Sequence, residues 1–192
     1  MAKPRKGGKN QSGQQTRAVL GKKGKARTPE EAIAATNPKW GTAEEYGVNC
    51  QRCVLAYEMQ RRGYNVEALP RVLDGTDPMD RRWENGFEGQ KWTKPGELGT
   101  RNTTVEQSII SKMSDWGDGS RAIVYVAWKS GSAHVFNVEN RGGNVSIFEA
   151  QTGKKYSLGE YLNISKPSRT TISRVDNLKP NLETMGYAVK RK

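Results

Sequence analysis

The chain of 192 residues carries 32 Lys and Arg against 20 Asp and Glu, a formal charge of +12, and only 34% hydrophobic residues. These values suit one modest globular domain with additional disordered sequence, and they exclude a second full domain. No apolar run approaches the roughly 20 residues of a membrane-spanning helix, and the N-terminus lacks the apolar stretch of a secretory signal, so we expect no membrane partner.

Residues 1–28 form the most basic part of the chain. They hold nine basic side chains and no acidic one, which leaves a charge of +3 for everything that follows. The nine are Lys3, Arg5, Lys6, Lys9, Arg17, Lys22, Lys23, Lys25 and Arg27. Because Val19 and Leu20 are the only sizeable apolar residues, burial cannot offset the conformational entropy, and we predict a disordered basic tail. Such cations bind phosphate backbones, so nucleic acid is a candidate partner of these nine residues; a solubilising leader is the alternative.

Two helices are predicted in the next part of the chain. The first begins at Thr28-Pro29-Glu30-Glu31, where a capping hydroxyl, a proline and two carboxylates precede an apolar run, and it ends at Asn37-Pro38. The second is an amphipathic helix from about Cys50 to Arg62, with Asn49 as its N-cap and Gly63 as its C-cap.

A short strand is predicted over 64–69, and the segment 70–102 then lacks any lasting periodicity. It is rich in Gly, Pro, Asp and Trp. Structureless loops of this length are uncommon in compact domains. We therefore interpret the segment as a binding loop anchored by Trp83, Phe87 and Trp92. The alternative is a region to which the sequence assigns no structure.

The second half of the chain predicts one helix followed by strands. The helix begins at Thr103-Thr104 and ends before Gly117. The strands are predicted at 121–128, 134–138, 144–148 and 170–175. Helices early and an antiparallel meander late predict an α+β fold in which the helix carrying Cys50 packs on the sheet. The predicted organisation is therefore a basic tail over 1–28, a domain over 29–178 and a loosely ordered end over 179–192.

Cys50 is the first candidate for chemistry. A cysteine at a helix N-terminus lies beside the positive end of the helix dipole and several unpaired N–H groups, which favour the thiolate and can stabilise an oxyanion. Cys53, one turn further into the helix, is interpreted as a structural cysteine. With only these two cysteines, three positions apart, the chain has no disulfide framework, which favours a reducing compartment such as the cytoplasm.

His134 is the only histidine and starts a predicted strand after a Gly-Ser-Ala turn. A cysteine nucleophile most often takes a histidine as its base, and that imidazole needs an acceptor on its other nitrogen to fix its orientation. Glu149 ends the next strand, where a hairpin would bring it near His134, and Gln151 is a second polar group at the same end of the sheet. Asn137 is the alternative orienting residue.

At these positions the sequence resembles a known family. The runs Asn49–Glu58 and Arg61–Pro70 are similar to the cysteine region of the Tox-PL papain-fold toxins (papain fold toxin 1, glutamine deamidase-like). The runs Ser132–Val138 and Phe148–Gly153 resemble the family's histidine and acidic motifs, in the same order of Cys, His and acid.

The resemblance spans about Tyr46 to Asp176. The run Arg174-Val175-Asp176-Asn177-Leu178 is similar to the closing motif of members encoded by phages and prophages, often attached to head-morphogenesis proteins. It does not cover the basic tail. A phage origin would make the protein virion-associated, and delivery into a host cell is a further alternative to the cytoplasm.

The resemblance implies a papain-like cysteine hydrolase fold with a triad of Cys50, His134 and Glu149, where the family usually has Asp at the third position. It also implies a protein substrate: some members deamidate glutamine in a host protein, and others cleave peptides. We expect glutamine deamidation first and a cysteine protease as the alternative. The oxyanion would bind the N–H of Cys50 and one further donor, for which Asn49 is the candidate, with Gln151 as a supporting residue.

Three other interpretations remain open. The CxxC motif of Cys50 and Cys53 at a helix start is typical of redox enzymes, although the expected βαβ order is missing. A zinc site would need Glu149 as a ligand beside the cysteines and His134. The chain would otherwise be a phage structural or DNA-associated protein with a non-catalytic papain-like module. We expect no metal or other cofactor, and phage head proteins or an immunity protein as further candidate partners.

Overall fold

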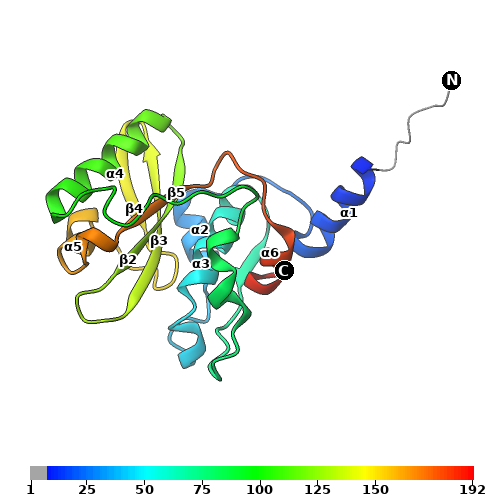
Figure 1. Ribbon diagram of the computed structural model, residues 1–192. Coiled ribbons are helices and arrows are strands. Elements are labelled where there is room, and N and C mark those ends of the chain that lie inside the picture. The colour runs from blue at the N-terminus through cyan, green and yellow to red at the C-terminus, as the bar shows by residue number, and fades with distance from the viewer. Residues whose placement is uncertain (1–7) are drawn as a thin grey trace.

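The computed structural model describes residues 8–192 and shows an antiparallel sheet with helices on both faces (Figure 1). The helices are α1 Gly8–Leu20, α2 Pro29–Thr36, α3 Cys50–Arg61, α4 Asn102–Trp116, α5 Leu158–Asn163 and α6 Leu182–Ala188. The strands are β1 Val66–Ala68, β2 Arg121–Ala127, β3 Ala133–Arg141, β4 Asn144–Phe148, β5 Thr171–Arg174 and β6 Val189–Arg191. None of these helices has the length and apolar character that crossing a bilayer requires.

The main sheet has the order β4-β3-β2-β5 and is antiparallel throughout. The predicted meander of three strands is therefore confirmed, and β5 joins it beside β2. A second, two-stranded sheet pairs β1 with β6, so that Val66 lies opposite Arg191. The α+β architecture predicted from the order of elements is what the chain adopts.

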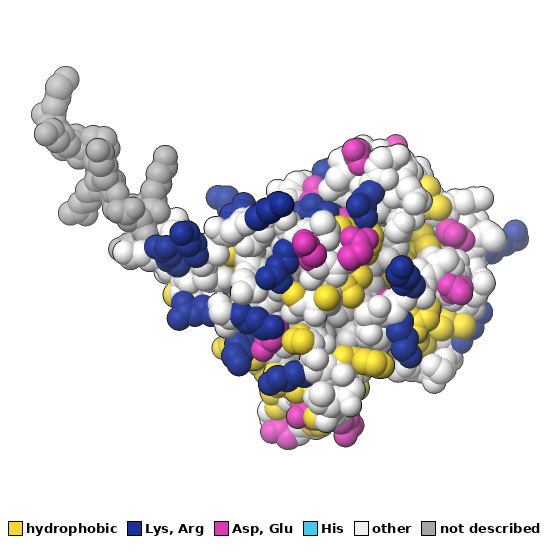
Figure 2. Space-filling view, turned by 180° about the vertical axis from the view of Figure 1, so that it is seen from behind, with side chains coloured by type: hydrophobic (Ala, Val, Ile, Leu, Met, Phe, Trp, Pro, Cys, Tyr) yellow, Lys and Arg dark blue, Asp and Glu magenta, His cyan; other side chains and the backbone are white. Residues whose placement is uncertain are grey.

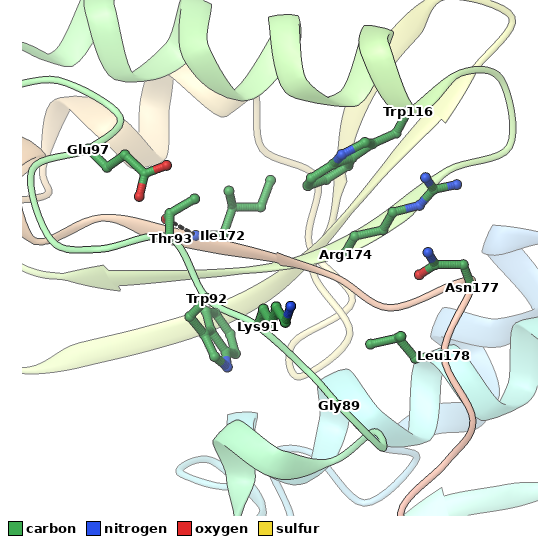
Figure 3. A pocket seen from close by; sticks show the side chains of 10 residues that line it. All are labelled: Gly89, Lys91, Trp92, Thr93, Glu97, Trp116, Ile172, Arg174, Asn177 and Leu178. Atoms are coloured by element: carbon green, nitrogen blue, oxygen red, sulfur yellow. Dashed lines mark hydrogen bonds between the residues drawn. The ribbon is translucent and has the colours of Figure 1, made fainter.

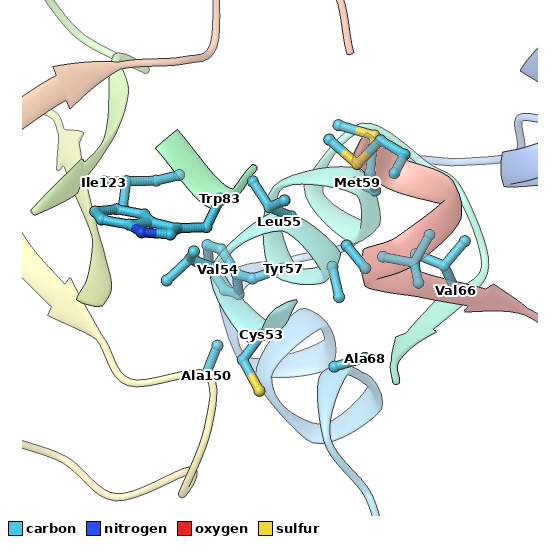
Figure 4. Close-up of a cluster of buried hydrophobic side chains, with 14 of the residues drawn as sticks. Cys53, Val54, Leu55, Tyr57, Met59, Val66, Ala68, Trp83, Ile123 and Ala150 are labelled. Atoms are coloured by element: carbon cyan, nitrogen blue, oxygen red, sulfur yellow. The ribbon is translucent and has the colours of Figure 1, made fainter. Parts of the chain in front are cut away.

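Side chains point to alternate faces of the sheet along each strand, so the buried residues form two clusters, one on each face. Ile123 and Val135 face α3, and this cluster continues to α6 and β1 (Figure 4). Val124, Val126 and Phe136 face the other way, against α4 and α5. The helix that carries Cys50 thus lies in one core and contacts the sheet, as predicted.

The helix α3 is buried on more sides than its sequence pattern indicates. Every residue from Arg52 to Gln60 is buried, because α2, α6, β1 and the sheet surround the helix. Its polar side chains therefore need partners. The carboxylate of Glu58 accepts hydrogen bonds from Arg62 and Arg121, and Arg61 pairs with Glu139 of β3 at 2.7 Å. These pairs fix α3 against β2 and β3.

The segment 70–102 is anchored by a buried ion pair as well as by aromatic side chains. Arg52 donates two hydrogen bonds to Asp77, at 2.7 and 2.8 Å, and both side chains are buried. Short 3₁₀ helices at Pro78–Arg81 and Trp83–Asn85 follow. Trp83 and Phe87 are buried, and Trp92 packs against the same cluster, as predicted for anchors of this loop.

The two chain ends differ from their predictions. Residues 8–20 form α1, whose last residue, Leu20, has no exposed surface, so the prediction of disorder over 1–28 is wrong for the described residues. The predicted loose end over 179–192 forms α6 and β6, where Met185 and Ala188 are fully buried. The folded unit therefore extends beyond 29–178 at both ends. Residues 1–7 lie outside the described residues.

Removing the carboxylate of Asp77 tests the anchor of the loop. We expect Asp77→Ala to lower the free energy of unfolding by about 3–5 kcal/mol, because it leaves the guanidinium of Arg52 buried without a charge partner. The matched control is Asp80→Ala, which breaks the half-exposed pair of Arg71 and Asp80 and should cost less than about 1 kcal/mol. Urea unfolding measures both, and equal losses would contradict the anchoring role.

Candidate active site

Cys50 is the first residue of α3, and its side chain is partly exposed. The carbonyl of Asn49 accepts the N–H groups of Arg52 and Cys53, whereas the N–H groups of Cys50 and Gln51 have no backbone acceptor among residues 8–192. Two free N–H groups therefore lie beside a thiol at the positive end of a helix. The unpaired N–H groups and the helix dipole attract negative charge, so this position can bind an oxyanion.

The side chain of Asn49 is fully engaged. Its amide nitrogen donates to Asn37 Oδ1 at 3.2 Å and to the carbonyl of Leu69 at 3.0 Å, and its oxygen accepts from Asn37 and from the thiol of Cys53. Asn49 therefore supports the start of α3, but its side chain has no free N–H for an oxyanion. The N–H of Gln51 is the better candidate for the second donor.

Asn37 is a supporting residue that the sequence did not indicate. Besides the two bonds to Asn49, its amide nitrogen donates to the carbonyls of Tyr46 and Gln151, each at 2.9 Å. Asn37 thus connects the residue before Cys50 with the loop after Glu149. The supporting role predicted for Gln151 uses its backbone: the N–H of Gln151 donates to Glu149 Oε1 at 3.1 Å.

His134 and Glu149 meet as the hairpin prediction requires. The Nε2 atom of His134 lies 2.7 Å from Glu149 Oε2, and both side chains are largely buried. Tyr161 of α5 donates its hydroxyl to the same carboxylate oxygen at 2.5 Å. Both oxygens of Glu149 are therefore held, one by His134 and Tyr161 and the other by the Gln151 N–H. No sequence pattern marks Tyr161 as a site residue, because α5 comes close to His134 and Glu149 only when the chain folds.

The imidazole of His134 is also held by aromatic rings. Trp128 stacks on it with ring centroids 5.8 Å apart, and Tyr161 meets it edge-on at 5.9 Å. The alternative orienting residue, Asn137, donates instead to the carbonyl of Val54 and does not contact His134. The packing leaves the imidazole one orientation, with its second nitrogen available to Cys50.

The charges of the site depend on one another. Burial by itself lowers the pKa of His134, but hydrogen bonds to Cys50 and Glu149, together with the carboxylate charge, raise that pKa to about 10. Burial favours a protonated Glu149, yet its hydrogen bond and ion pair with His134 lower the pKa of this carboxyl group. Both shifts favour an imidazolium paired with a carboxylate. Burial raises the pKa of the Cys53 thiol well above its usual range.

A pocket of about 370 Å³ opens onto Cys50 and His134. Its walls include Trp83 and Glu84 from the segment 70–102, and Tyr125 from β2. Trp83 stacks on Tyr125 with centroids 5.7 Å apart. The segment 70–102 thus forms part of a groove at the cysteine, as the interpretation of it as a binding loop requires.

A second pocket, of about 470 Å³, lies between β5, the end of α4 and the 89–97 segment (Figure 3). Trp92 lines it and also contacts Trp83 of the first pocket, with centroids 5.1 Å apart. Trp116 and Arg174 also line it, with the guanidinium of Arg174 over the indole ring, 5.8 Å from the ring centroid. The two pockets are separated by the pair of Trp83 and Trp92, and none of the predicted site residues lines the second one.

The structure also bears on the redox and zinc interpretations of the two cysteines. Cys50 and Cys53 are both free, and Cys53 is buried with its thiol bonded to Asn49. Within residues 8–192, no three His, Cys, Asp or Glu side chains gather in the way that a metal ion would need. The pairing of Cys53 with Asn49 agrees with a structural role for this cysteine.

The match to a family model agrees with this architecture. The profile of the family described as papain fold toxin 1, glutamine deamidase, matches residues 48–154, which include Cys50, His134 and Glu149. Together with the observed elements, this match confirms the predicted papain-like α+β fold. A solved structure of the Salmonella effector SpvD (G161 variant) is 15% identical, with 90% of this chain and 94% of that chain covered and a TM-score of 0.48. No curated protein matches the chain.

The two thiols are expected to differ in reactivity. Brief treatment with iodoacetamide near neutral pH should alkylate Cys50 faster than Cys53 by on the order of tenfold or more, because only Cys50 is accessible and flanked by free N–H groups. Peptide mapping by mass spectrometry measures both rates. Equal labelling, or ready formation of a Cys50–Cys53 disulfide, would favour the redox interpretation.

The imidazole provides a direct test of the charge coupling. Because His134 is the only histidine, its ring signal can be followed by NMR during a pH titration. We expect a pKa well above 6.5 in the unmodified chain and a lower pKa in Glu149→Gln, because removing a nearby negative charge destabilises the imidazolium while burial still opposes it. Tyr161→Phe keeps the carboxylate and should shift the pKa much less. An unchanged pKa in Glu149→Gln would contradict the coupling.

Proposed function

Because this chain belongs to the papain fold toxin 1, glutamine deamidase family, we propose that it hydrolyses the side-chain amide of glutamine in a protein substrate, with Cys50 as the nucleophile. His134 would serve as the acid and base, and Glu149 would orient it. The observation that carries the proposal is the position of His134 between Cys50 at the start of α3 and the doubly held carboxylate of Glu149.

The proposed reaction has two steps. The Cys50 thiolate attacks the amide carbon of glutamine, His134 protonates the leaving nitrogen, and ammonia departs to leave a thioester on the enzyme. Water, deprotonated by His134, then attacks the thioester, which releases glutamate in the substrate and restores the thiol. The raised pKa of His134 supports its role as the acid of the first step.

The negative charge of each tetrahedral intermediate needs hydrogen-bond donors. The N–H groups of Cys50 and Gln51 are free at the start of α3 and would supply them. Asn49 and Asn37 support these donors by fixing the turn before the helix. The groove formed by Trp83, Glu84 and Tyr125 would receive the glutamine side chain.

Glutamine deamidation converts an amide to a carboxylate and so leaves a mass signature. Incubation with a blocked glutamine dipeptide should release ammonia, and intact-mass analysis of a deamidated protein should show an increase of about 1 Da for each converted glutamine. Fragments of the protein instead of this increase would indicate the alternative, a cysteine protease. If neither product forms while Cys50 alkylates normally, the non-catalytic module of a phage structural protein becomes the better interpretation, with phage head proteins or an immunity protein as its partners.

Substitutions at Glu149 test the third position of the triad. We expect Glu149→Gln to keep the fold and to lower kcat by roughly two to four orders of magnitude, because the imidazolium loses its charge partner. Glu149→Asp should be much milder. Cys50→Ala should remove nearly all ammonia release, and adding Glu149→Gln to it should cost little more, because residues that act as a unit are not additive. Normal turnover in Glu149→Gln would refute the orienting role.

A further inference from the structure

The basic N-terminal segment and the basic C-terminus meet on one part of the surface. The backbone N–H of Gly24 donates to the carbonyl of Gly63 at 2.7 Å, and Lys23 forms an isolated β-bridge with Tyr64. From the other end of the chain, Arg191 donates to the carbonyl of Arg17 at 3.3 Å. Cations far apart in the sequence are therefore held near one another by backbone contacts and by the side chain of Arg191.

We name this region the terminal basic surface. It consists of Arg17, Lys22, Lys23, Lys25, Arg27, Lys190, Arg191 and Lys192. Figure 2 shows Lys and Arg side chains gathered where the N-terminal segment meets the body of the molecule. Lys3, Arg5 and Lys6 of the predicted binding set lie outside the described residues.

Most of these charges are not neutralised within residues 8–192. Lys190 and Lys192 share a single carboxylate, Glu67, at 3.9 and 2.9 Å. Arg27 bonds to the neutral amide of Asn65. The other five cations have no carboxylate within ion-pair distance in the described part of the chain. The eight cations outnumber the nearby carboxylates, which are Glu67 and, in a pocket shared with Lys25 and Arg27, Glu31, so the local field is positive.

The terminal basic surface is separate from the candidate active site. Its backbone contacts, Gly24 with Gly63 and Arg27 with Gln60, lie at the C-terminal end of α3, whereas Cys50 lies at the N-terminal end. A helix of this length spans about 18 Å at 1.5 Å per residue. A partner bound at the basic surface would not occupy the catalytic pocket.

The chemistry of the surface favours one class of partner. Stable attachment to an anionic membrane takes an apolar anchor beside the cations, but Leu20 and Val189, the apolar residues beneath the surface, are buried. A protein interface would need a desolvated apolar centre, which these lysines do not provide. Phosphate backbones need only fixed cations that release counterions. We propose that the terminal basic surface binds the phosphate backbone of nucleic acid, without sequence preference.

The test is the salt dependence of binding to a fluorescein-labelled 30-bp DNA duplex of mixed sequence. The full chain should bind, and the logarithm of its affinity should fall linearly with the logarithm of salt concentration. Neutralising the lysines in Lys22→Ala/Lys23→Ala/Lys25→Ala should lower affinity at about 0.1 M salt by at least roughly tenfold and reduce the salt slope by about 2 to 3. Fluorescence anisotropy measures both quantities.

The control triple removes the same charge from another surface. Lys154→Ala/Lys155→Ala/Lys166→Ala should leave the affinity within about threefold of the parent chain, because these exposed lysines lie outside the terminal basic surface. Equal losses in the two triples would show that net charge alone drives binding and would overturn the proposal.

A second variant tests the contribution of the C-terminus. Lys190→Ala/Lys192→Ala should also weaken binding, because it removes two cations and leaves Glu67 without its partners. An unchanged affinity in this variant would overturn the proposal that both chain ends together form the binding surface. Binding to phosphatidylserine vesicles but not to the duplex would assign the cations to a membrane and would equally overturn the proposal. Thermal unfolding of every variant verifies that the fold is retained.

Discussion

Burial of the α3 helix is the constraint on which the rest of the structure depends. A helix that places Arg52 and Glu58 in a core must give each charge a partner, because an unpaired charge in a low-dielectric interior costs several kcal/mol. Each partner comes from a different segment: Asp77 from the long loop, and Arg121 from β2. Satisfying the helix therefore also fixes the loop and the sheet around it, and with them the distance between Cys50 and the strand that carries His134.

The candidate site depends on this frame because its members come from separate elements. The thiol belongs to a helix, the imidazole to a strand and the carboxylate to the turn after the next strand. Glu149, although longer than the Asp usual in the family, is held at both oxygens, by Tyr161 and by the N–H of Gln151. These two bonds restrict the extra freedom of the glutamate side chain, so that the longer residue still presents one oxygen to the imidazole.

The sequence could predict those site residues that residue type and position mark as reactive. These are Cys50 at the start of a helix, His134 as the lone histidine at the start of a strand, and Glu149 at the end of the strand that pairs with it. It could not predict Tyr161 or Asn37, because a tyrosine or asparagine acquires such a role only through contacts between distant segments. The prediction of disorder near the N-terminus failed for a related physical reason. Few apolar residues argued against folding, but Leu20 is fully buried, and the glycine at position 63, where any Cβ would collide with the carbonyl of Gly24, allows the two segments to pair. Tertiary contacts overrode the local composition.

The pairing of β1 with β6 joins two strands more than a hundred residues apart in the chain. Contacts of such high sequence separation close a long loop, so their formation is slow compared with that of the local meander. During synthesis the chain emerges from its N-terminus, and β6 follows all four strands of the main sheet in the sequence. The main sheet can therefore assemble before β6 pairs with β1, and the pairing of these two strands then completes the layer that packs against α3.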